Sequence, residues 1–252
     1  MPIHLDSLRK LHSTVRPSCI RDSGPIYTET LQNGCHHKNI IIEPWNTMSA
    51  VPFVIVAFYI LWKLISERIL NWFYYYIAIL LFIGGIGGVL YHGFRSSEWY
   101  LLMDYVPIVV LCFTAAVYFT AQLFEKRRHG VVIILGVIFF NYLLNLVFEK
   151  AWTDNLNYAY LGAVTTLPSI LFAIKTRFAK SRYLLIAFFS FVIALFFRIS
   201  DDEYWLIRIM PFGSHWLWHL FGAVSSASLI YYIFVTYKVR KRGLKRSLTE
   251  TD

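Results

Sequence analysis

Charged residues are scarce in this sequence. Asp, Glu, Lys and Arg together make up 15% of its 252 residues, whereas 57% are hydrophobic and 18% are aromatic. A water-soluble domain of this length has room for a good core, but its surface needs far more charge than this. The mean hydropathy is +0.52, and the apolar residues come in long blocks. Both features argue against a soluble domain and favour a membrane protein.

The sequence also lacks internal repeats with periods of about 20–50 residues, and it lacks low-complexity tracts. Its first residues, MPIHLDSLRKLHS, contain no apolar stretch of the kind found in a cleavable signal peptide. We therefore expect the first apolar block to direct insertion itself. We also expect three parts: a polar tail outside the cytoplasm at 1–45, a transmembrane domain at 46–237 and a basic cytoplasmic tail at 238–252.

Cysteine is rare as well, with three residues in the chain. Cys112 lies within an apolar block, where we interpret it as a packing residue. Cys19 and Cys35 share the N-terminal tail, so a disulfide between them is one interpretation. Cys35 with the adjacent histidines 36–37 could instead bind a metal, and an incidental cluster is the third alternative.

Seven apolar blocks are long enough to cross a bilayer, which takes about 20 residues of helix. They span 47–66, 72–93, 99–124, 130–148, 157–174, 182–198 and 215–237. Lipid offers no partner for backbone amides, so each block is expected to be helical. The predicted fold is an all-α integral membrane protein, a bundle of seven transmembrane helices.

The net charge of +9 is unevenly distributed. If the spans alternate, nine of the 24 basic residues lie on the side of the N-terminal tail and fifteen lie on the other side, which includes the sequence KVRKRGLKR near the C-terminus. Cytoplasmic loops carry the excess of Lys and Arg, so the N-terminus is predicted outside or in a lumen. The basic tail is better explained by anionic lipid than by nucleic acid.

Apart from lysines and arginines near span ends, the ionisable groups within the predicted spans are few: His92, Asp104, His215 and His219. An Asp at a helix centre costs about 2.5–3.5 kcal/mol on insertion scales, so such groups need a reason. His215 and His219 are four residues apart and face the same side of a helix. The predicted topology brings all four groups to one layer near the non-cytoplasmic surface.

Three imidazoles and an open fourth position are typical of a catalytic zinc site. We therefore predict His92, His215 and His219 as metal ligands. Asp104 could orient a ligand or act as general base toward a metal-activated water. The alternative is a structural polar network that ties the second, third and seventh spans together.

The stretch EPWNT before the first span has two interpretations. Glu43 could bind a second cation or meet Arg198, with Pro44 breaking the tail and Asn46 or Thr47 capping the helix. Alternatively, the stretch is only a helix start with an aromatic residue at the membrane interface, which the residue chemistry alone favours.

Two further motifs are given simple interpretations. The acidic sequence SDDEYW at 200–205 is expected to be a solvated loop, in which Asp201 or Asp202 pairs with Arg198. The sequence GGIGG at 84–88 is expected to allow close helix packing. Room for a substrate chain is its second interpretation.

Three segments, EPWNTMS, then YHGF with MDYVPI, then PFGSHWLWHLFG, resemble the signatures of the alkaline ceramidase family. That family belongs to a superfamily of seven-span membrane hydrolases that also includes the progestin and adipoQ receptors. The resemblance covers residues 29–237. It implies a seven-helix bundle with one zinc that cleaves the amide of ceramide, with His92, His215 and His219 as zinc ligands and Asp104 as the catalytic aspartate.

The sequence departs from the family pattern at several positions. Gly88 stands where the family has a serine that helps to polarise the substrate carbonyl, and Ala50 stands where it has an asparagine. The spacing from His92 to Asp104 is one residue longer. In the family, calcium is held by the glutamate that matches Glu43 and by an acidic stretch. Here that stretch reads ETLQNG at 29–34, so good calcium binding is not expected.

The sequence thus predicts an integral membrane zinc hydrolase that cleaves ceramide or another N-acyl lipid. One alternative is a receptor or sensor of the same fold with structural or slowly catalytic zinc. A transporter would need ionisable groups along its whole path, and the spans contain few. Short tails and the lack of organelle signals favour a bacterial inner membrane over an ER or Golgi membrane. The oligomeric state is not predicted.

Overall fold

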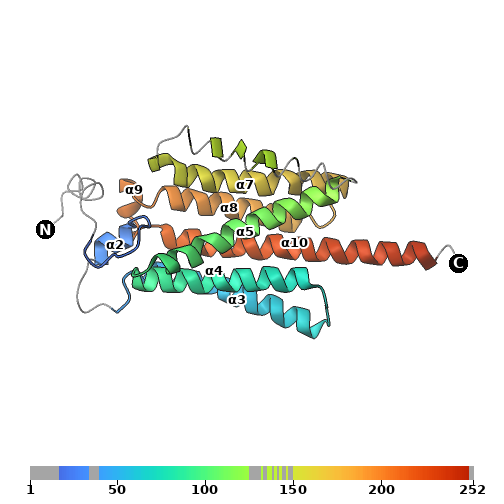
Figure 1. Ribbon diagram of the computed structural model, residues 1–252, viewed down its shortest axis with the longest axis horizontal. Coiled ribbons are helices and arrows are strands. Elements are labelled where there is room, and N and C mark those ends of the chain that lie inside the picture. The colour runs from blue at the N-terminus through green and yellow to red at the C-terminus, as the bar shows by residue number, and fades with distance from the viewer. Residues whose placement is uncertain are drawn as a thin grey trace. The chain divides into compact units, whose positions relative to one another are not determined.

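The computed structural model describes residues 17–33, 40–124 and 150–249, and positions 132, 135–137, 139–140, 142–143 and 146. Side chains at 150–155 and 238–249 are not among those described. This part of the chain contains helices and no strands (Figure 1). The elements are α2 (Thr28–Asn33), α3 (Pro44–Ser66), α4 (Trp72–Phe94), α5 (Glu98–Leu123), α7 (Lys150–Lys175), α8 (Arg182–Ile199), α9 (Tyr204–Ile207) and α10 (His215–Thr249).

Six of these helices are long and apolar enough to cross a membrane within the described residues. They are α3, α4, α5, α8, the part of α7 from Leu156 to Lys175, and the part of α10 from His215 to Tyr237. These helices confirm six of the seven predicted spans, with ends that differ by at most three residues. About half of the predicted span 130–148 lies outside the described residues.

The helix ends follow from local residue chemistry. Asn71 caps α4 by accepting a hydrogen bond from the N–H of Phe73, and Arg95 ends the helix in the left-handed conformation, with φ of 47°. The expected capping of the first span by Asn46 or Thr47 is wrong. Pro44 occupies the first turn of α3, so both residues lie inside the helix.

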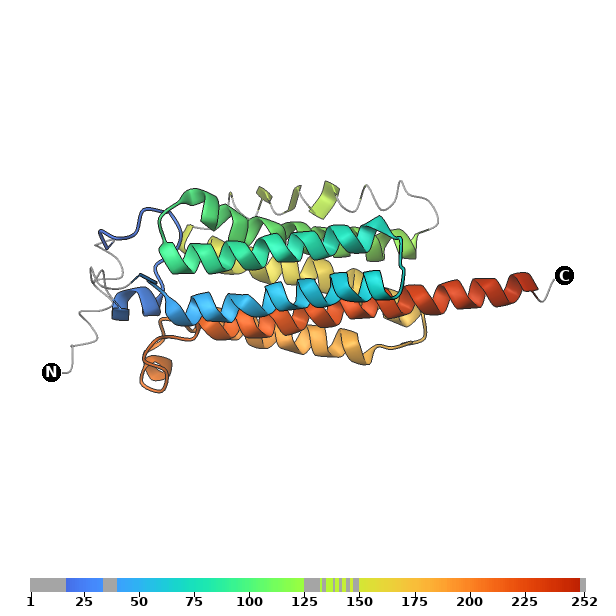
Figure 2. The ribbon, with the colours of Figure 1, turned by 90° about the horizontal axis from the view of Figure 1, so that it is seen from below.

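The described chain forms two compact units. The first comprises the described residues within 1–111 and 194–223, and the second those within 112–193 and 224–252. In the first unit, α3 and α4 are antiparallel and lie side by side in both views (Figures 1 and 2). The start of α3, the end of α4 and the start of α10 therefore meet at one end of this unit.

Glycines allow close approach between helices in the first unit. A β-carbon at Gly87 would overlap the backbone of Met103 and Asp104 on α5, and one at Gly85 would lie 2.9 Å from the backbone nitrogen of Val54 on α3. The expected role of GGIGG in close helix packing is therefore confirmed. The short distance between α4 and α5 places Asp104 directly beside the α4 backbone.

Residues 17–33 of the predicted polar tail pack onto the first unit. Ile20 and Tyr27 are buried with α2, whose first three residues are also buried. Cys19 is disulfide-bonded, and its expected partner Cys35 lies outside the described residues, as do the adjacent histidines 36–37. The free thiol of Cys112 is half-buried, in keeping with a packing role.

The second unit is held by aromatic and aliphatic packing. The rings of Phe119, Phe172 and Tyr232 are buried, with centroids 5.5 to 6.3 Å apart. Such spacings are typical of favourable aromatic pairs. The hydroxyls of Thr165 and Thr236 donate to carbonyls one turn earlier in their own helices. The Thr165 hydroxyl also lies 3.2 Å from the carbonyl of Cys112 on α5, so it links two helices of this unit.

Candidate metal centre

Three predicted ligands come together at the end of the first unit where α4 ends and α10 begins. His92 lies in the last turn of α4, and His215 and His219 lie in the first two turns of α10. Each offers a nitrogen, and these three nitrogens lie within 4.8 Å of one another. All three side chains are buried. The i, i+4 spacing presents both α10 imidazoles to the same point.

The tautomer of His92 follows from its carboxylate partner. Its Nδ1 lies 2.5 Å from Oε2 of Glu43. An ionised carboxylate only accepts hydrogen bonds, so Nδ1 carries the proton and Nε2 carries a lone pair. A carboxylate behind an imidazole is the usual means of fixing the ring of a metal ligand.

The other two histidines also direct nitrogens inward. Nε2 of His219 lies 3.1 Å from Nε2 of His92, and lone pairs this close repel unless a proton or a cation lies between them. The buried Nδ1 of His215 has no hydrogen-bond partner among the described residues. Ligand nitrogens around tetrahedral zinc lie about 3.3 Å apart, for Zn–N distances of about 2.0–2.1 Å. The donor set therefore fits a metal ion that prefers imidazole.

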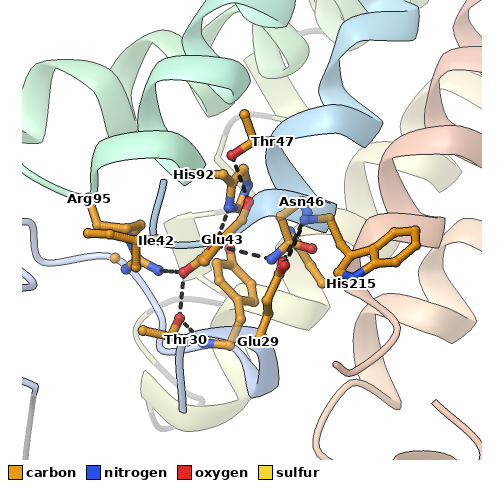
Figure 3. Close-up of polar contacts among 12 residues, drawn as sticks. Glu29, Thr30, Ile42, Glu43, Asn46, Thr47, His92, Arg95 and His215 are labelled. Carbon is orange, nitrogen blue, oxygen red and sulfur yellow. Dashed lines mark hydrogen bonds and ion pairs between the residues drawn. The ribbon is translucent and has the colours of Figure 1, made fainter. Parts of the chain in front are cut away.

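Glu43 lies at the centre of a buried polar network (Figure 3). Its position is set by the backbone, because the N–H of Ile42 donates to the carbonyl of Gly93 and the N–H of Glu43 donates to that of His92. Oε2 faces His92 and accepts from Asn46 Nδ2, while Oε1 accepts from Thr30 and Arg95. The glutamate that the sequence offered as a second cation site is thus surrounded by protein donors.

The charge of Glu43 is stabilised in place. Burial alone would raise its pKa, but His92, Arg95 and the hydrogen bond from Thr30 outweigh burial and lower the pKa to about 2. The arginine paired with Glu43 is Arg95, whereas the sequence offered Arg198 for this role. Burial alone would lower the pKa of Arg95, but Glu43 and Asp22 outweigh burial and raise the pKa above its ordinary value. The guanidinium therefore stays charged.

Asp201 holds the start of α10. Its Oδ1 accepts hydrogen bonds from the N–H groups of Ser214 and His215, and its Oδ2 accepts from that of Thr28. These bonds satisfy free amides at the helix N-terminus and orient the backbone of His215. The expected solvated loop at 200–205 is therefore wrong for Asp201, which is 7% exposed. Burial raises its pKa despite these three hydrogen bonds.

The N-terminal segment supplies two more contacts to the centre. The Tyr27 ring stacks on His215 with centroids 3.9 Å apart, and burial raises the pKa of Tyr27. The carboxylate of Glu29 accepts hydrogen bonds from the N–H groups of Trp45 and Asn46, and so caps α3. Burial raises the pKa of Glu29 to about 7, against the lowering effect of these two bonds.

Asp104 lies beside the centre but outside the group of three nitrogens. A β-carbon at Gly88, one turn before His92, would lie 2.9 Å from Asp104 Oδ1 and 2.9 Å from the Ala50 β-carbon. The carboxylate therefore contacts α4 where the residues are small, and it is half-buried.

Comparison with known proteins agrees with this geometry. The family model described as ceramidase matches residues 35–248, which is most of the chain. This chain belongs to the ceramidase family. A comparison with curated proteins finds no similar sequence. The family implies a multi-pass membrane hydrolase that acts on ceramide, and the three-histidine group of this ceramidase-family protein could bind a metal.

Several residues at the centre of this ceramidase-family protein were missed by sequence analysis. Arg95 follows a predicted span and entered only the count of basic residues, Asp22 and Tyr27 lay in a polar tail, and Asp201 lay in an acidic loop. Only the three-residue spacing from His92 to Arg95, close to one helical turn, was visible in the sequence. The partners of these residues lie far away in the chain.

Proposed function

We propose that this protein is a zinc-dependent amidohydrolase that cleaves the amide of ceramide or a related N-acyl lipid. The observation that carries the proposal is the Glu43–His92 pair, which directs a lone pair of His92 toward Nε2 of His219. Three convergent imidazoles with a carboxylate behind one of them suit a metal ligand set better than a simple polar network.

The metal is held by His92, His215 and His219 in this proposal. When bound, zinc supplies a Lewis acid that polarises a carbonyl and makes water a better nucleophile at neutral pH. Glu43 keeps the proton on Nδ1 of His92 and strengthens its Nε2 as a donor. Burial of all three imidazoles keeps bulk water from competing for the site.

Asp104 serves as the general base and acid. Water adds to the amide carbonyl carbon, one of its protons passes to the Asp104 carboxylate, and the C–N bond then breaks. Asp104 returns the proton to the leaving nitrogen, so that the products are a fatty acid and a sphingoid amine. The proximity of Asp104 Oδ1 to the α4 backbone, one turn from His92, supports this role.

Substrate reaches the site from within the membrane in this proposal. Tyr27 covers His215 from the side of the N-terminal segment, whereas Leu102, Tyr105 and Val106 beside Asp104 are each more than a third exposed. We place the site near the non-cytoplasmic surface, because the basic residues are in excess on the opposite side of a seven-span bundle. In this topology, residues 1–45 form the non-cytoplasmic tail, 46–237 form the transmembrane domain and 238–252 form the cytoplasmic tail.

A second candidate is a receptor or sensor of the same fold that holds structural zinc. Gly88 favours it, because this position next to Asp104 carries no hydroxyl that could bind a substrate carbonyl. The two candidates share the metal site and differ in turnover.

The test combines metal content with product release. Purified wild-type protein should contain about one zinc per chain and release fatty acid from ceramide, and His219→Ala should lose both. Asp104→Asn should keep the zinc and lose about 10²–10⁴-fold in rate, the usual contribution of a general acid–base group.

The controls separate the outcomes. Arg208→Met removes an exposed arginine and should match the wild type in both measurements. Zinc without fatty acid release from ceramide or other N-acyl lipids would favour the receptor. Full zinc content in His219→Ala would refute the proposed ligand set.

A further inference from the structure

Arg95 occupies an unusual position for an arginine at the end of a membrane helix. It lies three residues after His92, it adopts the left-handed conformation, and its side chain is fully buried. An arginine at the end of a span usually extends toward the interface and keeps its charge in water. This one instead turns inward, against the cost of burying its charge.

The guanidinium is bound by two carboxylates at once. Nε and Nη2 donate to the two oxygens of Asp22 at 3.0 and 2.9 Å, and Nη2 also donates to the Pro25 carbonyl at 2.8 Å. Nη1 donates to Oε1 of Glu43. The group further packs over the Tyr91 ring, 4.6 Å from its centroid. All three guanidinium nitrogens are therefore bound to the protein.

We propose that Arg95 is a positioning residue for the metal centre, which holds Glu43 against His92 and fastens the N-terminal segment beside His215. The proposal rests on the proposed function, because it requires His92 and His215 to be metal ligands.

Glu43 provides the first route from Arg95 to the centre. One oxygen of Glu43 meets Arg95 and Thr30, and the other meets His92. With Oε1 held by a charged donor, Oε2 is fixed toward Nδ1 of His92. Loss of the guanidinium would let the carboxylate rotate and would remove the charge that balances it.

The N-terminal segment provides the second route. Arg95 binds Asp22 and the Pro25 carbonyl through its side chain, and its backbone carbonyl accepts from the N–H of Arg21. Two residues beyond Pro25, Tyr27 stacks on His215. Arg95 thus acts on two of the three imidazoles, each through one intermediary.

Guanidinium chemistry suits this task better than an ammonium. Its planar fork binds two carboxylates in different directions, whereas Lys offers a single charged point. The protein thereby supplies a fixed cation between Asp22 and Glu43. Arg95→Lys should consequently retain only part of the effect, although it keeps the charge.

The experiment measures metal affinity directly. Metal-free wild-type protein and variants in detergent are titrated with cobalt(II), whose visible absorbance reports its coordination. Arg95→Met should bind cobalt about 10–100-fold more weakly, the usual effect of losing a partner behind the ligands. Arg95→Lys should fall between, and Arg208→Met, an exposed arginine, should match the wild type. Millimolar guanidinium should restore binding to Arg95→Ala.

Two further variants keep the test decisive. If Arg95→Met fails to fold, Asp22→Asn, which leaves the Arg95–Glu43 pair intact, should weaken cobalt binding by a smaller factor. The inference would be overturned if Arg95→Met bound cobalt with an affinity within twofold of the wild type while His92→Ala lost binding. If Arg95→Met does not fold, the same criterion applies to Asp22→Asn. Wild-type binding by His92→Ala would instead overturn the proposed function.

Discussion

The first unit buries carboxylates, an arginine and histidines, whereas the second unit buries only hydroxyls among the polar side chains described. The buried ionisable residues of the first unit are Asp22, Glu29, Glu43, His92, Arg95, Asp201, His215 and His219. The buried polar residues described in the second unit are Thr120, Thr165, Ser169, Ser190 and Thr236. Both units are built from helices of similar apolar composition.

The difference shows which contacts determine how the helices of each unit associate. In the second unit, buried hydroxyls bond to backbone carbonyls, of the same helix for Thr236 and also of a neighbouring helix for Thr165. Its buried polar contacts are therefore neutral, and helix association depends mainly on the shape of the packed rings. In the first unit, charged groups bind partners on other segments, and a buried charge that loses its partner is costly. The charges gather at one end, around three imidazoles. The free-energy cost of burying charged groups is therefore concentrated at the candidate site.

The largest expected effect is at Glu43. Glu43→Ala leaves Arg95 with one carboxylate and His92 with none, so it should cost about 4 kcal/mol of unfolding free energy. It should also weaken metal binding. Unfolding in mixed detergent micelles and metal titration measure both effects. A loss below about 1 kcal/mol would remove the distinction between the two units.

Phe119 tests the second unit at nearly the same scale. Phe119→Ala deletes a fully buried ring and should cost about 3 kcal/mol, mainly through lost packing. Metal content should stay at the wild-type level, since Phe119 belongs to the second unit and the residues of the centre belong to the first. Metal loss in a folded Phe119→Ala protein would show that the units are energetically coupled.

Asp201 should have an intermediate effect. Asp201→Ala removes the acceptor for three backbone N–H groups at Thr28, Ser214 and His215, and a lost helix cap costs about 1–2 kcal/mol. Asp201→Asn keeps one oxygen and should recover part of the loss. Equal stability of Asp201→Ala and the wild type in thermal unfolding would contradict the capping role.

The charge of Glu29 makes stability depend on pH. Burial raises its pKa from 4.5 to about 7, so the folded protein binds this proton more tightly than the unfolded chain. That contribution to stability is present below about pH 4.5 and is lost as the pH rises through about 7. Glu29→Gln should remove this decline in melting temperature, whereas Glu67→Gln, at an exposed site, should keep it. Parallel profiles for Glu29→Gln and the wild type would exclude the role.

The smallest expected effect is at Thr236. Its hydroxyl donates to carbonyls of Tyr232 and Ile233 in the same helix, which already bond within that helix. Thr236→Val keeps the shape, so the unfolding free energy should change by less than about 0.5 kcal/mol. A loss above about 2 kcal/mol would mean that the Thr236 hydroxyl has a partner outside its own helix.

The sequence was enough to predict the six spans that the structure describes, because hydrophobic length is a local property that lipid imposes on each segment. It was also enough to predict the meeting of His92, His215 and His219, since alternating spans bring the end of one helix and the start of another to the same surface. The resemblance to ceramidases rested on those same segments, and the family match agrees with it.

What surrounds the imidazoles was decided by tertiary structure alone. Arg95 is bound by Asp22, 73 residues away in the chain, and Asp201 accepts from Thr28, 173 residues away. No periodicity or hydropathy reports such pairs, because a charge in a loop looks the same whether water or a buried partner satisfies it. Only the folded chain shows which charges lie close enough to neutralise each other without water.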